Sequence, residues 1–160
     1  MMLGFKTKRI LGTSFYETAA KVAEFLNYPQ NIMIVSSEDY REGLPACAMA
    51  AHMGEPILFA TGNDLPSYTR SAIQKNPNAS VYIIGSTNTI SYEVAREIQS
   101  LNVKFLDRIS GNTPYEVAVN FAKYKSPAGD FGWGRTEREG HAFTFTSVLE
   151  IGRASCRERV

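Results

Sequence analysis

The stretch "RILGTSFYETAAKVAEF" at residues 9–25 decides the fold, because it returns as "RISGNTPYEVAVNFAKY" at residues 108–124. The copies align without a gap, Arg108 standing 99 residues after Arg9, and they share Arg, Ile, Gly, Tyr, Glu and two Ala. A stretch that recurs at a fixed offset indicates a repeated structural unit. We therefore expect the chain to contain a module that begins again near residue 108.

Each copy carries the signature of a helix start. Ser14 and Thr113 stand three residues before Glu17 and Glu116, which is the spacing of a capping box. The hydroxyl accepts from a free amide of the first turn, and the carboxylate reaches back to the cap. Either Glu could instead serve as an acid or base catalyst, but a cap explains the spacing fully.

Strand and helix patterns alternate between the two copies. Short apolar runs rich in β-formers predict strands at residues 31–35, 56–60, 81–85 and 103–109. Helical spacing places apolar residues on one face in two of the intervening segments, Val94, Ala95, Ile98 and Leu101 in one, and Tyr40, Leu44, Cys47, Ala48 and Ala51 in the other. We expect the second of these helices to begin near residues 41–44, and Asp64 and Ser91 to cap the two helices that follow.

This order predicts an α/β fold, a parallel sheet with helices on both faces in three layers. Residues 9–107 would form one complete module, and residues 108–149 the truncated start of a second. The helix beginning at Pro114 must then dock on the first module or fray, since an isolated helix of this length is marginal. The insert that follows, with Phe131, Gly132 and Trp133, would have no complete domain to join, and residues 141–147 read as the next strand.

The last eleven residues, 150–160, depart abruptly in composition from the strand-like run before them. Their back-translation resembles the read-through of a common sequencing adapter. We interpret them as an artefact tail and exclude them from the fold.

The overall composition argues against several classes of function. The tail carries three Arg and two Glu, so the chain without it has no net charge, and nothing in its charge favours nucleic acid or an anionic membrane. Its apolar runs are too short for a membrane span. Cys47 lacks an intrachain partner outside the tail, and we interpret it as a small buried hydrophobe.

The order of these motifs resembles the cell wall binding repeat of type 2, over one full module and the opening helix of the next. The residues that carry the resemblance are the "RI-G---YE" helix starts, the small-residue helix after the first strand, and the "PIL", "LP--T", "VYIIG" and "IS-EV" segments. The sequence departs from the family in two places. Glu42 replaces the usual Asp of the small-residue helix, and the usual Asn-Arg pair at the helix starts is absent from both copies, with Phe15 in the first.

The resemblance implies a non-catalytic attachment module that binds an anionic cell-wall glycopolymer noncovalently. It implies neighbouring modules of the same kind as partners, a place outside the cell at the wall or surface, and no cofactor. Open α/β sheets bind ligands beyond the carboxyl ends of their strands. The ligand-binding residues predicted there are Arg9, Glu42, Gly85, Ser86, Thr87, Asn88 and Arg108. Each Arg could instead pair with a carboxylate or cap a helix.

Two other functions stay open. The strand, Gly turn and helix at residues 81–91 could cradle a nucleotide or sugar phosphate on the amides of Ser86 and Thr87, although neither glycine-rich phosphate motif is present. Alternatively, the module is a structural spacer of a surface protein, which the missing Arg of both copies favours. We expect neither a metal site nor a catalytic residue, because His52 and His141 lie far apart and outside any ligand motif.

Overall fold

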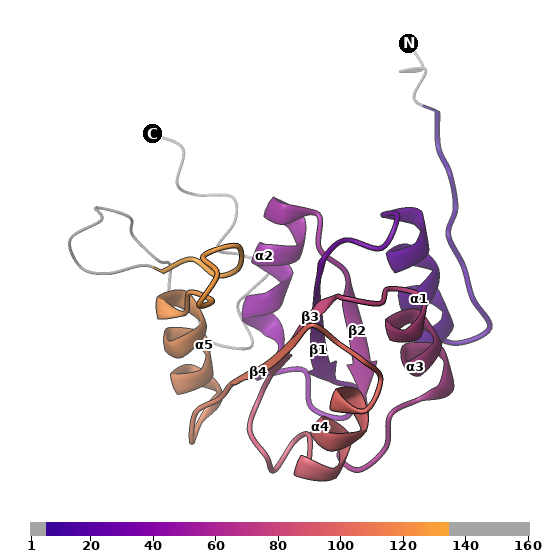
Figure 1. Cartoon of the computed structure of the whole chain (residues 1–160). Coiled ribbons are helices and arrows are strands. Elements are labelled where there is room, and N and C mark those ends of the chain that lie inside the picture. The colour runs from indigo at the N-terminus through magenta and orange to yellow at the C-terminus, as the bar shows by residue number, and fades with distance from the viewer. Residues whose placement is uncertain (1–5, 135–160) are drawn as a thin grey trace, which may run out of the picture.

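A computed structural model describes residues 6–134 of the chain. Helices and strands alternate throughout this part, as the sequence predicts (Figure 1). The helices are α1 (Phe15–Phe25), α2 (Leu44–Met53), α3 (Ser67–Gln74), α4 (Tyr92–Gln99) and α5 (Pro114–Lys123), and the strands are β1 (Asn31–Ser36), β2 (Ile57–Ala60), β3 (Ser80–Ile84) and β4 (Phe105–Ile109).

The four strands form one parallel sheet in the order β2-β1-β3-β4. The central strand β1 pairs Ile34 with Leu58 of β2 on one side and with Ile83 of β3 on the other. Strands β1 and β3 are buried along their whole length, as the continuous apolar runs predict. The parallel sheet of the predicted fold class is therefore confirmed.

Helices cover both faces of the sheet, which completes the three layers (Figure 1). Alternate side chains of β1 separate two apolar clusters, because successive residues of a strand point to opposite faces. Ile32 and Ile34 join the first cluster with α1, α3 and α4, whereas Met33 and Val35 join the second cluster with α2 and α5. Both clusters thus share one sheet.

The predicted caps of the repeated helices are confirmed. The hydroxyls of Ser14 and Thr113 accept from the amides of Glu17 and Glu116, respectively. Each carboxylate reaches back one residue beyond the cap, and Glu17 accepts from the backbone amide and the hydroxyl of Thr13. Ser91 caps α4 as expected, but Asp64 does not cap α3, whose cap position is Pro66.

The predicted inner face of α2 is wrong. The helix begins at Leu44 as expected, yet it buries Ala46 and Met49, and it leaves Cys47 exposed. Small apolar residues occur on every side of this helix, so the apolar periodicity does not predict which side faces the sheet. Cys47 is consequently not the buried hydrophobe that the sequence analysis expected.

Helix α5 docks on the sheet of the first module, as predicted, with Val117 and Phe121 buried in the second cluster. The insert after it was expected to have no complete domain to join, but it packs on this sheet. Phe131 is 2% exposed and stacks on Tyr82, with ring centroids 3.7 Å apart and planes 8° from parallel. The predicted strand at residues 141–147, His141 and the tail at residues 150–160 lie outside the described residues.

Candidate functional site at the carboxyl ends of the strands

The carboxylate of Glu42 organises the turn between β3 and α4. Glu42 precedes α2 and is 7% exposed. Its Oε2 accepts from the amide of Ser86 at 2.7 Å and from the hydroxyl of Thr89 at 2.6 Å, and its Oε1 accepts from the Ser86 hydroxyl at 3.1 Å. A buried carboxylate with several donors is well stabilised. The Glu42 carboxylate therefore binds the chain's own turn, through one backbone amide and two hydroxyls.

Gly85 makes this approach possible. Its φ of 142° lies in the region that favours glycine, and a Cβ built there would lie 2.9 Å from both Glu42 Oε2 and Thr89 Oγ1. Any side chain at this position would push the carboxylate from the turn. The glycine of the expected phosphate cradle thus serves an internal contact.

Arg108, at the end of β4, holds the same turn from the opposite side. Its Nη1 donates to the carbonyls of Gly85 and Ser86, both at 3.0 Å, and its Nη2 donates to the carbonyl of Ser91 at 3.3 Å. The guanidinium also lies over the ring of Tyr92, 5.9 Å from the centroid. Burial lowers the pKa of Arg108 from its usual value, although a guanidinium stays charged in proteins.

The structure brings together Glu42, Gly85, Ser86 and Arg108 of the predicted ligand-binding residues. It leaves Thr87 and Asn88 exposed at the tip of the same turn, and Arg9 exposed in the segment before α1. Sequence reasoning missed Thr89 and gave Ser91 only a capping role, although both complete the hydrogen bonds of the turn. The signal was available, since hydroxyl residues crowd residues 86–91.

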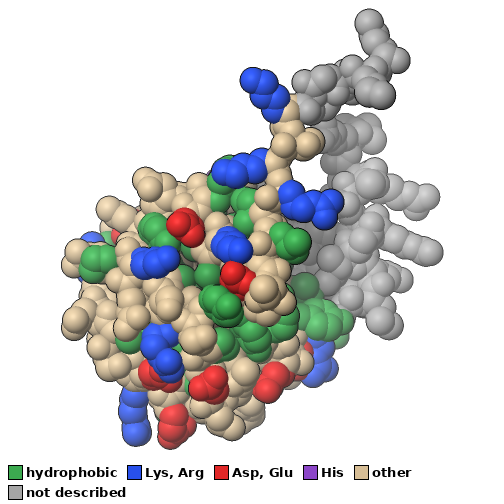
Figure 2. Space-filling model, turned by 90° about the vertical axis from the view of Figure 1, so that its right-hand side faces the viewer, with side chains coloured by type: hydrophobic (Ala, Val, Ile, Leu, Met, Phe, Trp, Pro, Cys, Tyr) green, Lys and Arg blue, Asp and Glu red, His purple; other side chains and the backbone are tan. Residues whose placement is uncertain are grey.

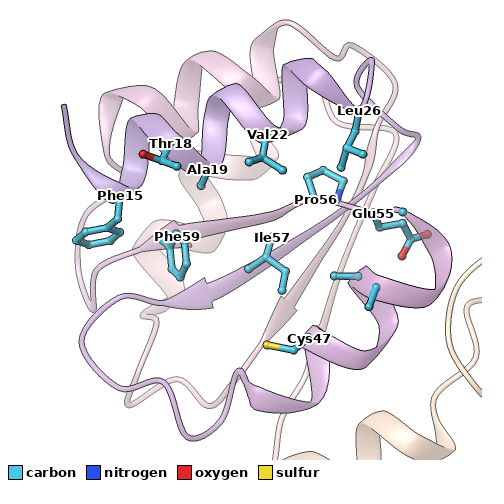
Figure 3. Close-up of a pocket in the computed structure, with 13 residues that line it drawn as sticks. Phe15, Thr18, Ala19, Val22, Leu26, Cys47, Glu55, Pro56, Ile57 and Phe59 are labelled. Carbon is cyan, nitrogen blue, oxygen red and sulfur yellow. The ribbon is translucent and has the colours of Figure 1, made fainter. Parts of the chain in front are cut away.

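A second feature, an apolar groove of about 620 Å³, opens between α1 and α2 above β2 (Figure 3). Its lining is almost entirely apolar, and sequence reasoning missed it because its walls come from segments about thirty residues apart. The side chains that project into it include Phe15, Thr18, Val22, Cys47, Ile57 and Phe59.

Phe15 belongs to this groove and contacts Phe59 edge-on, with ring centroids 5.4 Å apart, while remaining 53% exposed. It occupies one position of the Asn-Arg pair that the family resemblance leads one to expect. In the first copy, the aromatic ring of Phe15 therefore lines the groove at a position where the family usually has a polar or cationic side chain.

Within residues 6–134, no cluster of three or more His, Cys, Asp or Glu side chains could hold a metal ion. None of the helices there has the length and apolar character that a membrane crossing requires. His52 is exposed, with its ring centroid 5.3 Å from that of Trp133.

Two curated proteins are similar to this chain in sequence. The chain is 33% identical over 121 residues to N-acetylmuramoyl-L-alanine amidase LytC of Bacillus subtilis (strain 168), an alignment that covers 76% of this chain and 23% of that protein. It is 31% identical over 119 residues to Amidase enhancer of the same organism, covering 73% and 16% of the two chains. The chain thus spans less than a quarter of either relative.

Two solved structures have the same architecture. Cwp6 from Clostridium difficile superposes with a TM-score of 0.66 at 29% identity, over 72% of this chain and 18% of that one. Cwp8 from the same organism superposes with a TM-score of 0.62 at 22% identity, over 76% and 20%, and supports the fold alone. The sequence model described as Cell wall binding domain 2 (CWB2) matches residues 9–95, more than half of the chain. The chain belongs to the Cell wall binding domain 2 family.

Proposed function

We propose that this chain is a non-catalytic attachment module that binds an anionic cell-wall glycopolymer noncovalently, as one unit of a tandem array at the cell surface. The observation that carries the proposal is the family match over residues 9–95. The named relatives are an amidase and an amidase enhancer, and the aligned part is a small share of each. Attachment, and not the chemistry of those relatives, is the role we assign to this part.

The carboxyl ends of the strands are the proposed contact region. Glu42 and Arg108 are held by the chain itself, so we assign polymer contact to the exposed tip of the turn, Thr87 and Asn88. A hydroxyl and an amide bind polyol and phosphodiester groups through individually weak hydrogen bonds. Tandem copies would raise the avidity by about 10² to 10⁴ if several bind at once.

The surface charge agrees with weak contact by each unit. On the face that Figure 2 shows, Lys and Arg side chains alternate with Asp and Glu over the body of the module. The cations that gather there lie along the N-terminal segment, where Lys6, Lys8 and Arg9 are exposed. Because long-range attraction needs a cluster of one sign, we expect a single module to bind the polymer weakly and the repetition of modules to strengthen that binding.

The nucleotide or sugar-phosphate alternative has less support. A phosphate at this turn would need the amide of Ser86, and that amide donates to the Glu42 carboxylate at 2.7 Å. An incoming phosphate would have to displace a buried negative charge, which is costly. The turn is already occupied by an anion of the chain itself.

Sedimentation with isolated, protein-free walls of a Gram-positive bacterium tests the proposal. We expect the full chain to sediment with the walls, and retention to disappear after acid extraction of the secondary polymers. The double variant Thr87→Ala, Asn88→Ala should lose retention. Its matched control, Gln74→Ala with Gln99→Ala, removes two exposed polar residues at helix ends away from this turn and should keep it. Retention that survives extraction, or equal behaviour of the two double variants, would contradict the proposal.

A structural spacer would give a different result, with no retention even for a protein that carries several modules in tandem. That result would leave the fold and the family intact and would remove the polymer as a partner.

A further inference from the structure

The two copies of the repeated helix bury different sides. Helix α1 buries Ala19 and Ala23 in the first cluster, whereas α5 buries Val117 and Phe121 in the second cluster. In the alignment of the copies, Ala19 and Ala23 correspond to Ala118 and Ala122, and Val117 and Phe121 correspond to Thr18 and Val22. The repeated helix therefore has one side that packs on the sheet following it and another side that packs on the sheet preceding it.

In α1 the second of these sides faces the apolar groove. Thr18 and Val22 are half-buried and line the groove together with Cys47 on α2 (Figure 3). Their equivalents in α5 are fully buried against the sheet that precedes α5. An apolar surface that is covered in one copy and open in the other is an interaction surface without its occupant.

The segments that precede the two helices also differ in this way, one being packed against a sheet and the other exposed. Arg108 is the penultimate residue of β4, and its guanidinium occupies a pocket of three carbonyls. Its equivalent Arg9 is exposed in residues 6–10, ahead of α1. The segments that connect each Arg to its helix have similar backbone geometry in the two copies. A Cβ built on Gly12 would lie 2.6 Å from the Cβ of Glu17, and one built on Gly111 would lie 2.6 Å from the Cβ of Glu116.

We propose that residues 6–10 and α1 form a docking unit for a second module of the same kind that precedes this one. Residues 6–10 pair with the β3 of that module as its β4. Arg9 enters the carbonyl pocket of its turn between β3 and α4, and α1 packs the Thr18 and Val22 side against its α2 face. The preceding module fills the groove and covers Cys47. This inference rests on the tandem arrangement of the proposed function and specifies how adjacent modules join.

A tandem protein built at the natural offset tests the interface. Residues 1–107 are joined directly to residues 9–160, with Cys156→Ser, so that Arg9 of the downstream unit takes the place of Arg108 in the upstream unit. Two versions each keep one of the two copies of Cys47, the other being changed to Ser. The readout is the rate of thiol labelling by a disulfide reagent. We expect the upstream Cys47 to react like that of the single chain, and the downstream Cys47 to react at least about tenfold more slowly, because labelling then requires local opening.

Two variants of the downstream α1 serve as a matched pair. Val22→Asp places a charge in the interface and should restore fast labelling, whereas Glu24→Gln changes an exposed residue outside the groove and should preserve protection. Equal labelling of the two Cys47 copies in a cooperatively folded tandem protein would overturn the proposal.

If the tandem protein does not fold, a helix exchange in the single chain decides. Residues 108–124 are replaced by the sequence of residues 9–25. The proposal requires this chain to fold with Trp133 still packed beside the second cluster. An unfolded chain, or one with Trp133 emission at the wavelength of free tryptophan, would overturn it.

Wall sedimentation of the same proteins distinguishes the interface hypothesis from the polymer hypothesis. Protected Cys47 without wall retention refutes the polymer alone, and retention with unprotected Cys47 refutes the interface alone.

Discussion

Glu42 illustrates how a residue that resembles a ligand can be a structural anchor. Its carboxylate accepts three hydrogen bonds from Ser86 and Thr89, and Glu42→Gln replaces one accepting oxygen by a donor that faces other donors. We expect this variant to lower the free energy of unfolding by about 2 kcal/mol, measured by urea denaturation. Glu38→Gln is the control, since Glu38 is exposed and accepts from a single amide of Gly62 at 3.0 Å. Equal losses in the two variants would show that burial of the carboxylate is unimportant.

Glu17 predicts a pH dependence of the cap of α1. Hydrogen bonds from the Thr13 amide and hydroxyl, with the contribution of Lys21, lower the pKa of Glu17 from 4.5 to about 2. A group whose pKa is lower in the folded state stabilises the fold above its unfolded pKa and loses that effect as the pH falls through the folded pKa. The stabilisation by Glu17 should therefore decline between about pH 4.5 and pH 2. Thermal midpoints of the wild type and Glu17→Gln should converge over this window, and a difference between them that stays constant down to pH 2 would contradict the prediction.

At the scale of elements, the pairing of Phe131 with Tyr82 ties the segment after α5 to the sheet. Phe131→Ala removes a stacked ring that is 2% exposed, and we expect a loss of about 3 kcal/mol in the free energy of unfolding. Tyr115→Ala, in the first turn of α5 and 65% exposed, is the control and should stay within about 0.5 kcal/mol. A small effect of Phe131→Ala would show that this contact does not hold the segment on the sheet.

Local sequence patterns predicted the helices and strands, whereas long-range contacts determine which of their faces are buried and which residues pair. The runs at residues 31–35 and 81–85 predicted strands because burial on both faces demands continuous apolar residues. The inward side of α2 could not be predicted, since its alanines are alike on every side. The contact between Glu42 and Ser86 joins residues 44 positions apart, and no spacing rule reaches that far. The sequence therefore predicted that the loop residues lie at the same edge of the sheet, but it did not predict their hydrogen-bond partners.

The whole molecule should unfold as one unit, because both clusters share the sheet through alternate residues of β1 and β3. Trp133 is the single tryptophan of the chain and packs against the second cluster, with its ring near that of His52, so its fluorescence reports the docking of the segment after α5. Far-ultraviolet circular dichroism reports the helices of both faces. In a two-state transition the two signals coincide along the urea axis, and we expect one midpoint. Trp133→Phe should abolish the fluorescence change and leave the dichroism transition. A fluorescence midpoint at lower urea would instead make α5 and the segment that follows it a separate, weaker unit.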